Sequence, residues 1–150
     1  MIYIKKAEQE NLDELSFLFD AYRQFYNQTP DLEGAKKFLL QRMGNNESVI
    51  FIAFDDDKAI GFTQLYPIFS SVSMQKAWLL NDLFVNSNIR KKGVGTQLLD
   101  AAKQHAAETE AKWLLLSTGC DNETAQSVYE NNGWKRVTDV FYEFVLHANQ

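Results

Sequence analysis

The stretch NIRKKGVGTQLL, residues Asn88–Leu99, places three cations and two glycines directly before a segment with helical periodicity. The first backbone N–H groups of a helix have no partner within the helix, and the helix dipole adds partial positive charge at that end. Such a helix start binds phosphate readily. Glycine permits a tight turn and lets oxygen atoms reach the backbone, because it carries no side chain. The stretch therefore predicts a turn that holds a pyrophosphate group.

A plainer interpretation of the same stretch is a turn that needed glycine, followed by a run of solvated cations. The stretch is neither a P-loop nor a dinucleotide-binding fingerprint, since Leu98 stands where the last glycine of G-x-G-x-x-G is required. The rest of the chain has to decide between the two interpretations.

Hydrophobic periodicity divides the remaining chain into short strands and amphipathic helices. In chain order, the pattern predicts a strand at Ile2–Ile4, helices from Leu12 and at Leu32–Met43, strands at Val49–Phe54, Ala59–Tyr66 and Ala77–Val85, a helix at Val94–Glu108, a strand at Lys112–Ser117, a helix at Asn122–Asn132, and strands at Trp134–Arg136 and Val140–Leu146. A loop is expected at Ser70–Gln75. The order β-α-α-β-β-β-α-β-α-β-β predicts an α/β domain (an α+β mixed sheet) that spans residues 1–150.

Composition narrows the classes of function. The chain has 150 residues, 45% of them hydrophobic and 23% charged, as in a soluble globular domain. Its net charge of −5 and its lack of a basic stripe argue against a nucleic-acid partner. Its apolar runs are too short to cross a membrane, and its start does not resemble a secretory signal. We therefore expect a cytoplasmic protein with neither a membrane nor a nucleic-acid partner.

Metal and thiol chemistry have little support in the sequence. The lone Cys120 excludes an internal disulfide and a cysteine-based metal cluster, while His105 and His147 stand apart from other ligand types. No metal is expected. Cys120 invites comparison with an acyl-enzyme nucleophile, but a small residue after a strand is the better interpretation.

Three segments, in the same order as in the family, resemble motifs of the GNAT N-acetyltransferase superfamily. The run Arg90-Lys91-Lys92-Gly93-Val94-Gly95 resembles its [RQ]-x-x-G-x-[GA] acetyl-CoA motif, Leu79–Val85 resembles its central strand, and Asn122-x-x-Ala125-x-x-x-Tyr129-x-x-x-Gly133-Trp134 is similar to its second motif. The resemblance covers nearly the whole chain and is closest to the diamine and spermidine/spermine acetyltransferases. It implies a mixed sheet splayed between its fourth and fifth strands, and a homodimer.

The resemblance also implies where acetyl-CoA binds. Its pantetheine arm would pair with the backbone of Leu83, Phe84 and Val85 like an added strand. Its pyrophosphate would lie on the turn formed by Arg90, Lys91, Lys92, Gly93, Val94, Gly95 and Thr96. Asn122 matches a family asparagine that often contacts the cofactor, and asparagine is equally a favoured helix N-cap.

Acetyl transfer to an amine requires a deprotonated amine and, for the departing thiolate, a proton. Tyr129 is the candidate acid, because a phenol stays protonated at neutral pH and the matching family tyrosine often points at the thioester sulfur. A core aromatic residue is the alternative. The polyamine-type relatives carry a glutamate where this chain has Asn81, which leaves Asp82 as the candidate base. Strand alternation sends Asp82 to the opposite face unless a bulge intervenes. A water chain, or an amine that arrives neutral, would replace it.

Asn81 is expected to contact the acceptor, and Tyr22 and Tyr26 fall in a region that shapes the acceptor cleft in the family. Their rings would face an amine cation, or else cap the core. The sequence as a whole predicts an N-acetyltransferase that acts on a primary amine of a small molecule within a ternary complex. The alternatives are a protein N-terminus or lysine as acceptor, and an acyl-CoA-binding module without catalysis.

Overall fold

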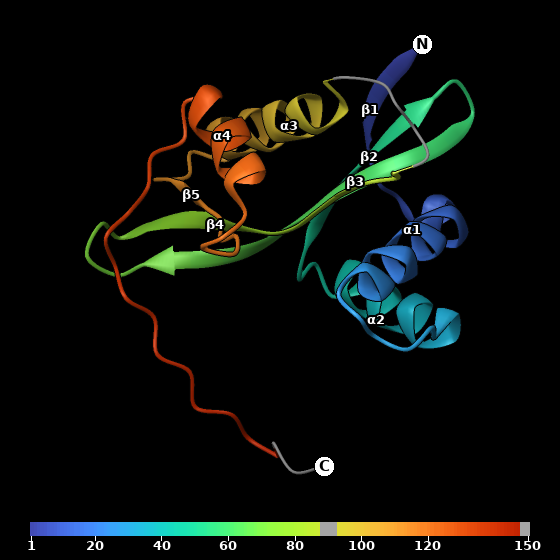
Figure 1. Ribbon diagram of the computed structural model, residues 1–150, viewed down its shortest axis with the longest axis horizontal. Helices are drawn as coiled ribbons and strands as arrows, with labels where there is room; N and C mark the ends of the chain where they lie inside the picture. Colours follow the sequence, from blue (N-terminus) through green and yellow to red (C-terminus); the bar gives the residue numbers. More distant parts are fainter. Residues whose placement is uncertain (88–92, 148–150) are drawn as a thin grey trace. The chain divides into compact units, whose positions relative to one another are not determined.

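The computed structural model describes residues 1–87 and 93–147. The chain forms two compact units, Met1–Ser117 and Thr118–Gln150, which are described separately. The first unit contains a mixed sheet with helices on both faces, and the second contains helix α4 (Figure 1).

The sheet of the first unit has the strand order β1-β2-β3-β4-β5. Neighbouring strands pair antiparallel from β1 to β4, and β5 runs parallel to β4. The strands are β1 (Ile2–Lys6), β2 (Val49–Asp55), β3 (Lys58–Ser70), β4 (Gln75–Val85) and β5 (Leu114–Leu115). A sheet of mixed direction confirms the fold class that the periodicity predicted.

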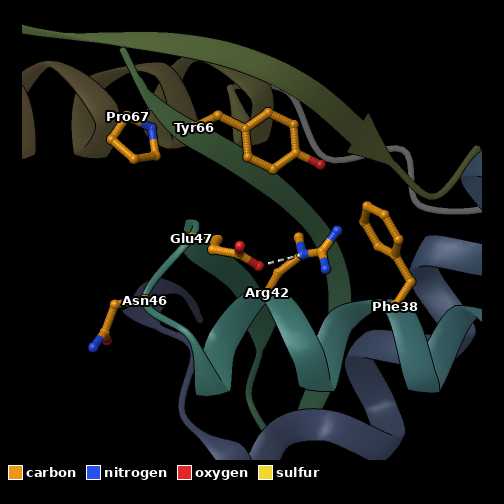
Figure 2. A pocket seen from close by; sticks show the side chains of 6 residues that line it. All are labelled: Phe38, Arg42, Asn46, Glu47, Tyr66 and Pro67. Atoms are coloured by element: carbon orange, nitrogen blue, oxygen red, sulfur yellow. Dashed lines mark ion pairs between the residues drawn. The ribbon is translucent and has the colours of Figure 1, made fainter. Parts of the chain in front are cut away.

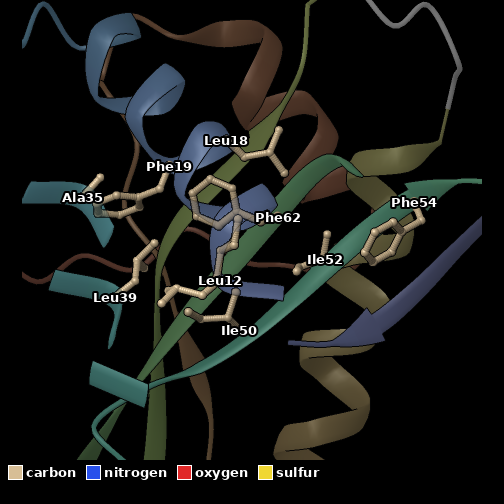
Figure 3. Close-up of a cluster of buried hydrophobic side chains, with 10 residues drawn as sticks. Leu12, Leu18, Phe19, Ala35, Leu39, Ile50, Ile52, Phe54 and Phe62 are labelled. Atoms are coloured by element: carbon tan, nitrogen blue, oxygen red, sulfur yellow. The ribbon is translucent and has the colours of Figure 1, made fainter. Parts of the chain in front are cut away.

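Helices cover both faces of this sheet. After a short 3₁₀ turn, η1, at Gln9–Asn11, helices α1 (Leu12–Phe25) and α2 (Leu32–Gly44) cover one face, and α3 (Val94–Glu108) covers the other (Figure 1). Side chains alternate along β2, so that Ile50 and Ile52 pack with α1 and α2 (Figure 3). Ala53 packs instead with α3. Burial on both faces explains why these strands read as continuous apolar runs.

The connection between α1 and α2 is held by a buried carboxylate. Asp20 accepts hydrogen bonds from the backbone N–H of Asp31 and from Arg23, whose Nη1 lies 2.7 Å from Oδ1. Asp31 in turn caps α2, because its side chain accepts from the N–H of Gly34. These contacts fix the end of α1, which carries Tyr22.

The sheet opens between β4 and β5. Their pairing is confined to Trp78 with Leu114 and Leu79 with Leu115. Beyond Leu79, no described strand pairs with this edge of β4, so Leu80–Val85 has a strand partner only on the β3 side. The expected splay between the fourth and fifth strands is thus confirmed.

Strand β3 is longer than predicted, since it continues through Pro67 to Ser70. Proline cannot donate a hydrogen bond to a neighbouring strand. β2 pairs with β3 only as far as Leu65, so Pro67 has a strand partner only in β4. No hydrogen bond to β2 is therefore missing at Pro67. The turn at residues 71–74 confirms the loop that the sequence predicts there.

Two of the predicted strands, Trp134–Arg136 and Val140–Leu146, are wrong for this structure. Neither segment has regular secondary structure, and Tyr142 and Phe144 are 94% and 88% exposed. Apolar residues do alternate there, but a strand needs a neighbour for its backbone N–H and C=O groups, and no described strand pairs with these segments. The predicted strand Lys112–Ser117 shrinks for the same reason to β5.

In the second unit, α4 spans Glu123–Asn131. The side chain of Asn122 accepts a hydrogen bond of 3.1 Å from the backbone N–H of Ala125, which confirms its role as N-cap. Gly133 follows the helix at a φ of 89°, a left-handed conformation that glycine adopts without strain.

Candidate active site

A bulge in β4 brings Asn81 and Asp82 together. Gln64 on β3 pairs with Asp82, while the next residue, Leu65, pairs with Leu80, which leaves Asn81 without a partner on β3. Adjacent side chains of a regular strand point to opposite faces. Here the Nδ2 of Asn81 donates to Oδ1 of Asp82 over 3.0 Å. Strand alternation sends Asp82 to the opposite face from Asn81 unless a bulge intervenes, and β4 contains that bulge.

The carboxylate of Asp82 is buried among neutral donors. The residue is 4% exposed, and its Oδ2 accepts from Nε2 of Gln64 over 2.6 Å. The hydroxyl of Tyr22 donates to the same carboxylate. Burial raises the pKa of Asp82, and the hydrogen bonds from Gln64, Tyr22 and Asn81 partly oppose that rise. The group is a carboxylate whose basicity exceeds that of an exposed one.

Aromatic rings from β3 and β4 pack around Tyr22 of α1, the residue that donates to this carboxylate. The ring of Tyr22 makes edge contacts with Phe62 and Phe84, at centroid distances of 5.7 and 6.0 Å. Tyr26 packs on Tyr22 at 5.1 Å. Burial, followed by the charge of Asp82, raises the pKa of Tyr22 well above its ordinary value, so this phenol remains a donor at neutral pH. The structure thus brings Tyr22 and Asn81 to Asp82 and packs Tyr26 on Tyr22, and the catalytic and substrate-binding roles of these residues stay predictions.

Sequence reasoning missed Gln64 and Thr63. Both are fully buried, and the hydroxyl of Thr63 donates to the backbone oxygen of Asp82 over 2.8 Å. Their signal was two adjacent polar residues inside an apolar strand, because buried polar side chains are retained where they make hydrogen bonds.

A pocket of about 530 Å³, also missed, lies between α2 and β3 (Figure 2). It is lined by Phe38, Arg42, Asn46, Glu47, Tyr66 and Pro67. Nε of Arg42 lies 3.0 Å from Oε1 of Glu47. Burial, and then the charge of Asp82, raises the pKa of Tyr66 to about 12, and the charge of Arg42 partly opposes that rise. No signal in the sequence joined Arg42 to Tyr66, because they lie on different elements.

The start of α3 fits a diphosphate. Gly93 is the N-cap at a φ of 88°, and no side chain caps the helix. The first helical bond runs from the N–H of Gln97 to the oxygen of Gly93, so Val94, Gly95 and Thr96 carry the donors that have no acceptor within the helix. A Cβ at Gly93 or Gly95 would meet no described atom within 4 Å, which leaves room for a ligand. Arg90, Lys91 and Lys92 lie outside the described residues.

The predicted pantetheine strand lies on the open edge of β4. Leu83, Phe84 and Val85 follow Leu79, the last residue that pairs with β5. On the opposite side, Gly61 faces Val85, and a Cβ at Gly61 would lie 2.7 Å from the backbone oxygen of Phe84. Glycine therefore permits the close approach of β3 while the other edge of β4 has no described strand beside it.

The remaining predicted residues lie in the second unit. Tyr129 is on α4, with its ring 6.2 Å from that of Trp134, and Asn122 caps the same helix. Their roles toward acetyl-CoA stay predictions. Cys120 is a free, exposed thiol.

Two further properties concern the described part of the chain. Its His, Cys, Asp and Glu side chains form no group of three that would hold a metal ion. Within the same residues, no helix combines the length and the apolar character that crossing a membrane requires.

Comparisons with known proteins agree with this geometry. A sequence model of the acetyltransferase (GNAT) family matches residues 12–134. The chain is 49% identical over 145 residues, 97% of each chain, to YhfO of Bacillus subtilis, an uncharacterized N-acetyltransferase. The crystal structure of a probable acetyltransferase, 40% identical, aligns over 99% of both chains with a TM-score of 0.90.

A more distant structure shares the fold alone. It is an aminoglycoside N-acetyltransferase, AAC(6')-Iy, in complex with CoA, which is 18% identical and has a TM-score of 0.81 over 97% of this chain and 95% of its own. Family match, sequence identity and fold lead to one conclusion: the chain belongs to the acetyltransferase (GNAT) family and is an acetyltransferase.

Proposed function

We propose that this acetyltransferase moves the acetyl group of acetyl-CoA to a primary amine of a small molecule, by direct attack within a ternary complex. One observation carries the proposal. The bulge at Asn81 places the buried Asp82 carboxylate, to which Tyr22 of α1 donates, on the strand whose other edge is open. A base and a cofactor-binding edge thereby share β4.

The residues of the chain divide the binding of acetyl-CoA between them. The backbone donors of Val94, Gly95 and Thr96 would hold the diphosphate, and the edge of Leu83–Val85 would hold the pantetheine arm. Bound acetyl-CoA supplies the acetyl group as an activated thioester. The binding residues keep the acetyl carbon beside the amine, which replaces a bimolecular encounter by a positioned one.

Proton movement falls to two side chains in this proposal. The attacking amine loses its proton to the carboxylate of Asp82, either directly or through the hydroxyl of Tyr22, which passes its own proton to Asp82 as it takes the proton of the amine. A carboxyl whose pKa is raised is a more effective base near neutral pH. Tyr129 keeps its phenolic proton for the sulfur that leaves.

The test is a thiol-release assay with acetyl-CoA and a panel of polyamines, amino acids, aminoglycosides and short peptides. Turnover on a small amine supports the proposal, and turnover confined to peptides replaces it by a protein acceptor. If the protein binds CoA but none of the amines in the panel causes thiol release, the proposed acetyl transfer is refuted. Tyr129→Phe sharpens the assay, because loss of the acid lowers kcat while CoA binding persists.

The homodimer and the cytoplasmic location expected from the sequence also stay proposals. Support for association comes from residues 137–146, where Val140, Phe141, Tyr142 and Phe144 are exposed. Apolar exposure on this scale is typical of a surface that another chain covers.

A further inference from the structure

The pocket between α2 and β3 offers hydrogen-bond donors to a ligand. Arg42 and Phe38 reach into it from α2, and Tyr66 comes from β3 on the opposite side (Figure 2). Asn46 and Glu47 line it from the segment that follows α2, and the pocket is open to solvent. Its volume of about 530 Å³ suits a small molecule.

The guanidinium of Arg42 is held in place from two sides. Its Cζ lies 4.6 Å from the centroid of the Phe38 ring, and its Nε lies 3.0 Å from Glu47. Its side chain is 26% exposed. In Figure 2 the Nη end points away from Glu47, into the space between Phe38 and Tyr66. The contact with Glu47 is an ion pair and not a hydrogen bond, because Nε has no hydrogen-bond partner among the described atoms. A guanidinium carries five N–H donors, so the Nη donors are left for a second anion.

Tyr66 adds a second donor to the same space. Its hydroxyl stays protonated at neutral pH, since burial and Asp82 both favour the neutral phenol. Arginine with a neighbouring hydroxyl is a donor set suited to a carboxylate, which arginine recognises through two parallel hydrogen bonds. Glu47 is already paired, so it does not make the pocket a cation site.

The pocket lies on the same face of the sheet as the side chain that donates to the candidate base. Tyr66 and Gln64 lie two residues apart on β3, so they share a face of the sheet, and Gln64 donates to Asp82 over 2.6 Å. A ligand held by Arg42 thus lies on the face of the sheet where Asp82 would receive the amine proton.

We propose that this pocket binds a carboxylate of the acceptor, so that the substrate is an amine that also carries a carboxylate, in the manner of an amino acid. The inference rests on the proposed function, since it names the substrate class of the same site. Arg42 is its specificity-determining residue, and Tyr66 is its second donor.

The experiment compares amines that differ only in the carboxylate: lysine against cadaverine, and ornithine against putrescine. We expect kcat/KM to be about 10- to 100-fold higher for the amino acid of each pair, as for a hydrogen-bonded charge. Arg42→Met removes this preference by raising KM for the amino acid, with KM for acetyl-CoA unchanged. Calorimetric titration of lysine and cadaverine reports the same preference without turnover.

Two variants separate recognition from a structural role. Lys37→Met removes an exposed cation from the same helix and is expected to keep the preference. Glu47→Gln breaks the internal ion pair but leaves Arg42 available, so amino acids should bind as well or better. If Arg42 mattered only for folding, Glu47→Gln would lower the melting temperature and the activity as Arg42→Met does, and the inference would fail.

The outcomes also distinguish the inference from the function beneath it. Equal or faster turnover of cadaverine and putrescine overturns the carboxylate pocket and leaves the acetyltransferase proposal standing. If the protein still binds CoA but none of the amines causes thiol release, both proposals are overturned.

Discussion

Asn81 donates a hydrogen bond over 3.0 Å to the carboxylate of Asp82, its own neighbour along β4. The contact exists because the bulge turns one of the two side chains away from regular alternation. The carboxylate then meets donors from Gln64, Tyr22 and Asn81, all of them neutral. A buried carboxylate with neutral partners resists ionisation, which prepares it to take a proton.

Asp82→Asn should lower kcat by about 10²- to 10⁴-fold, the usual contribution of a general base, with KM for acetyl-CoA preserved. The free energy of unfolding of this variant, in contrast, should not fall at pH 8. Because the folded-state pKa of Asp82 is raised, its contribution to stability is fully present at acidic pH and is lost as pH rises through that pKa. At pH 8 the variant should therefore resist urea at least as well as the wild type, and the advantage should vanish below about pH 3.8, the ordinary carboxyl pKa.

The amide in this variant finds a partner nearby, because Oε1 of Gln64 is buried and has no partner among the described atoms. Asp57→Asn, in the exposed turn before β3, serves as the control and should change neither property. A variant that loses stability along with activity would point to a structural role for Asp82.

Gly61→Ala should destabilise the sheet by about 1–3 kcal/mol, the typical cost of overpacking. The added Cβ would lie 2.7 Å from the backbone oxygen of Phe84, so β4 must shift where acetyl-CoA is proposed to bind. Urea unfolding and KM for acetyl-CoA measure the two effects. Gly44→Ala is the matched control, since a Cβ there meets no described atom within 4 Å. Equal behaviour of the two variants would contradict the close approach.

Stability should fall as pH drops below about 6.5, because of His105. This imidazole packs at the edges of Trp78 and Phe51, at centroid distances of 4.8 and 5.7 Å. Burial, and then the charge of Lys6, lowers its pKa. The unfolded chain thus takes up a proton first, and the folded state loses its advantage as pH falls from the ordinary value toward the lowered one.

Urea unfolding at pH 7.5 and 5.5 measures this loss. His105→Gln should reduce the difference between the two pH values, whereas His147→Gln, in the exposed C-terminal segment, should leave it as in the wild type. An undiminished difference in His105→Gln would assign the pH dependence to other groups.

The exposed segment at residues 137–146 should mediate association with a second copy. Tyr142→Ser combined with Phe144→Ser removes two of its exposed rings, so a wild-type dimer should dissociate to monomers at tens of micromolar. Sedimentation velocity reports the change, and Glu143→Gln in the same segment is the control. A wild-type protein that sediments as a monomer would end the dimer proposal.

Local patterns in the sequence were enough for the helices, for most of the strands and for the family. Asn122 predicted the start of α4, and Gly93 with the periodicity after it predicted the start of α3, because a cap or an amphipathic helix depends on residues within a few positions. Short apolar runs predicted β1, β2 and β4, and the resemblance to the GNAT family implied the splayed sheet.

Only the tertiary structure decided which side chains contact Asp82 and whether Val140–Leu146 forms a strand. The bulge at Asn81 arises from the register in which β3 pairs with β4, and the pocket is lined by Arg42 of α2 and Tyr66 of β3. Both depend on residues far apart in the chain, so no local sequence pattern predicts them. The alternation at Val140–Leu146 indicated a strand, yet the segment forms none. A strand needs a neighbouring strand for its backbone hydrogen bonds, and no described strand pairs with this segment. Sequence determined what each segment tends to form, and packing determined which of those segments meet.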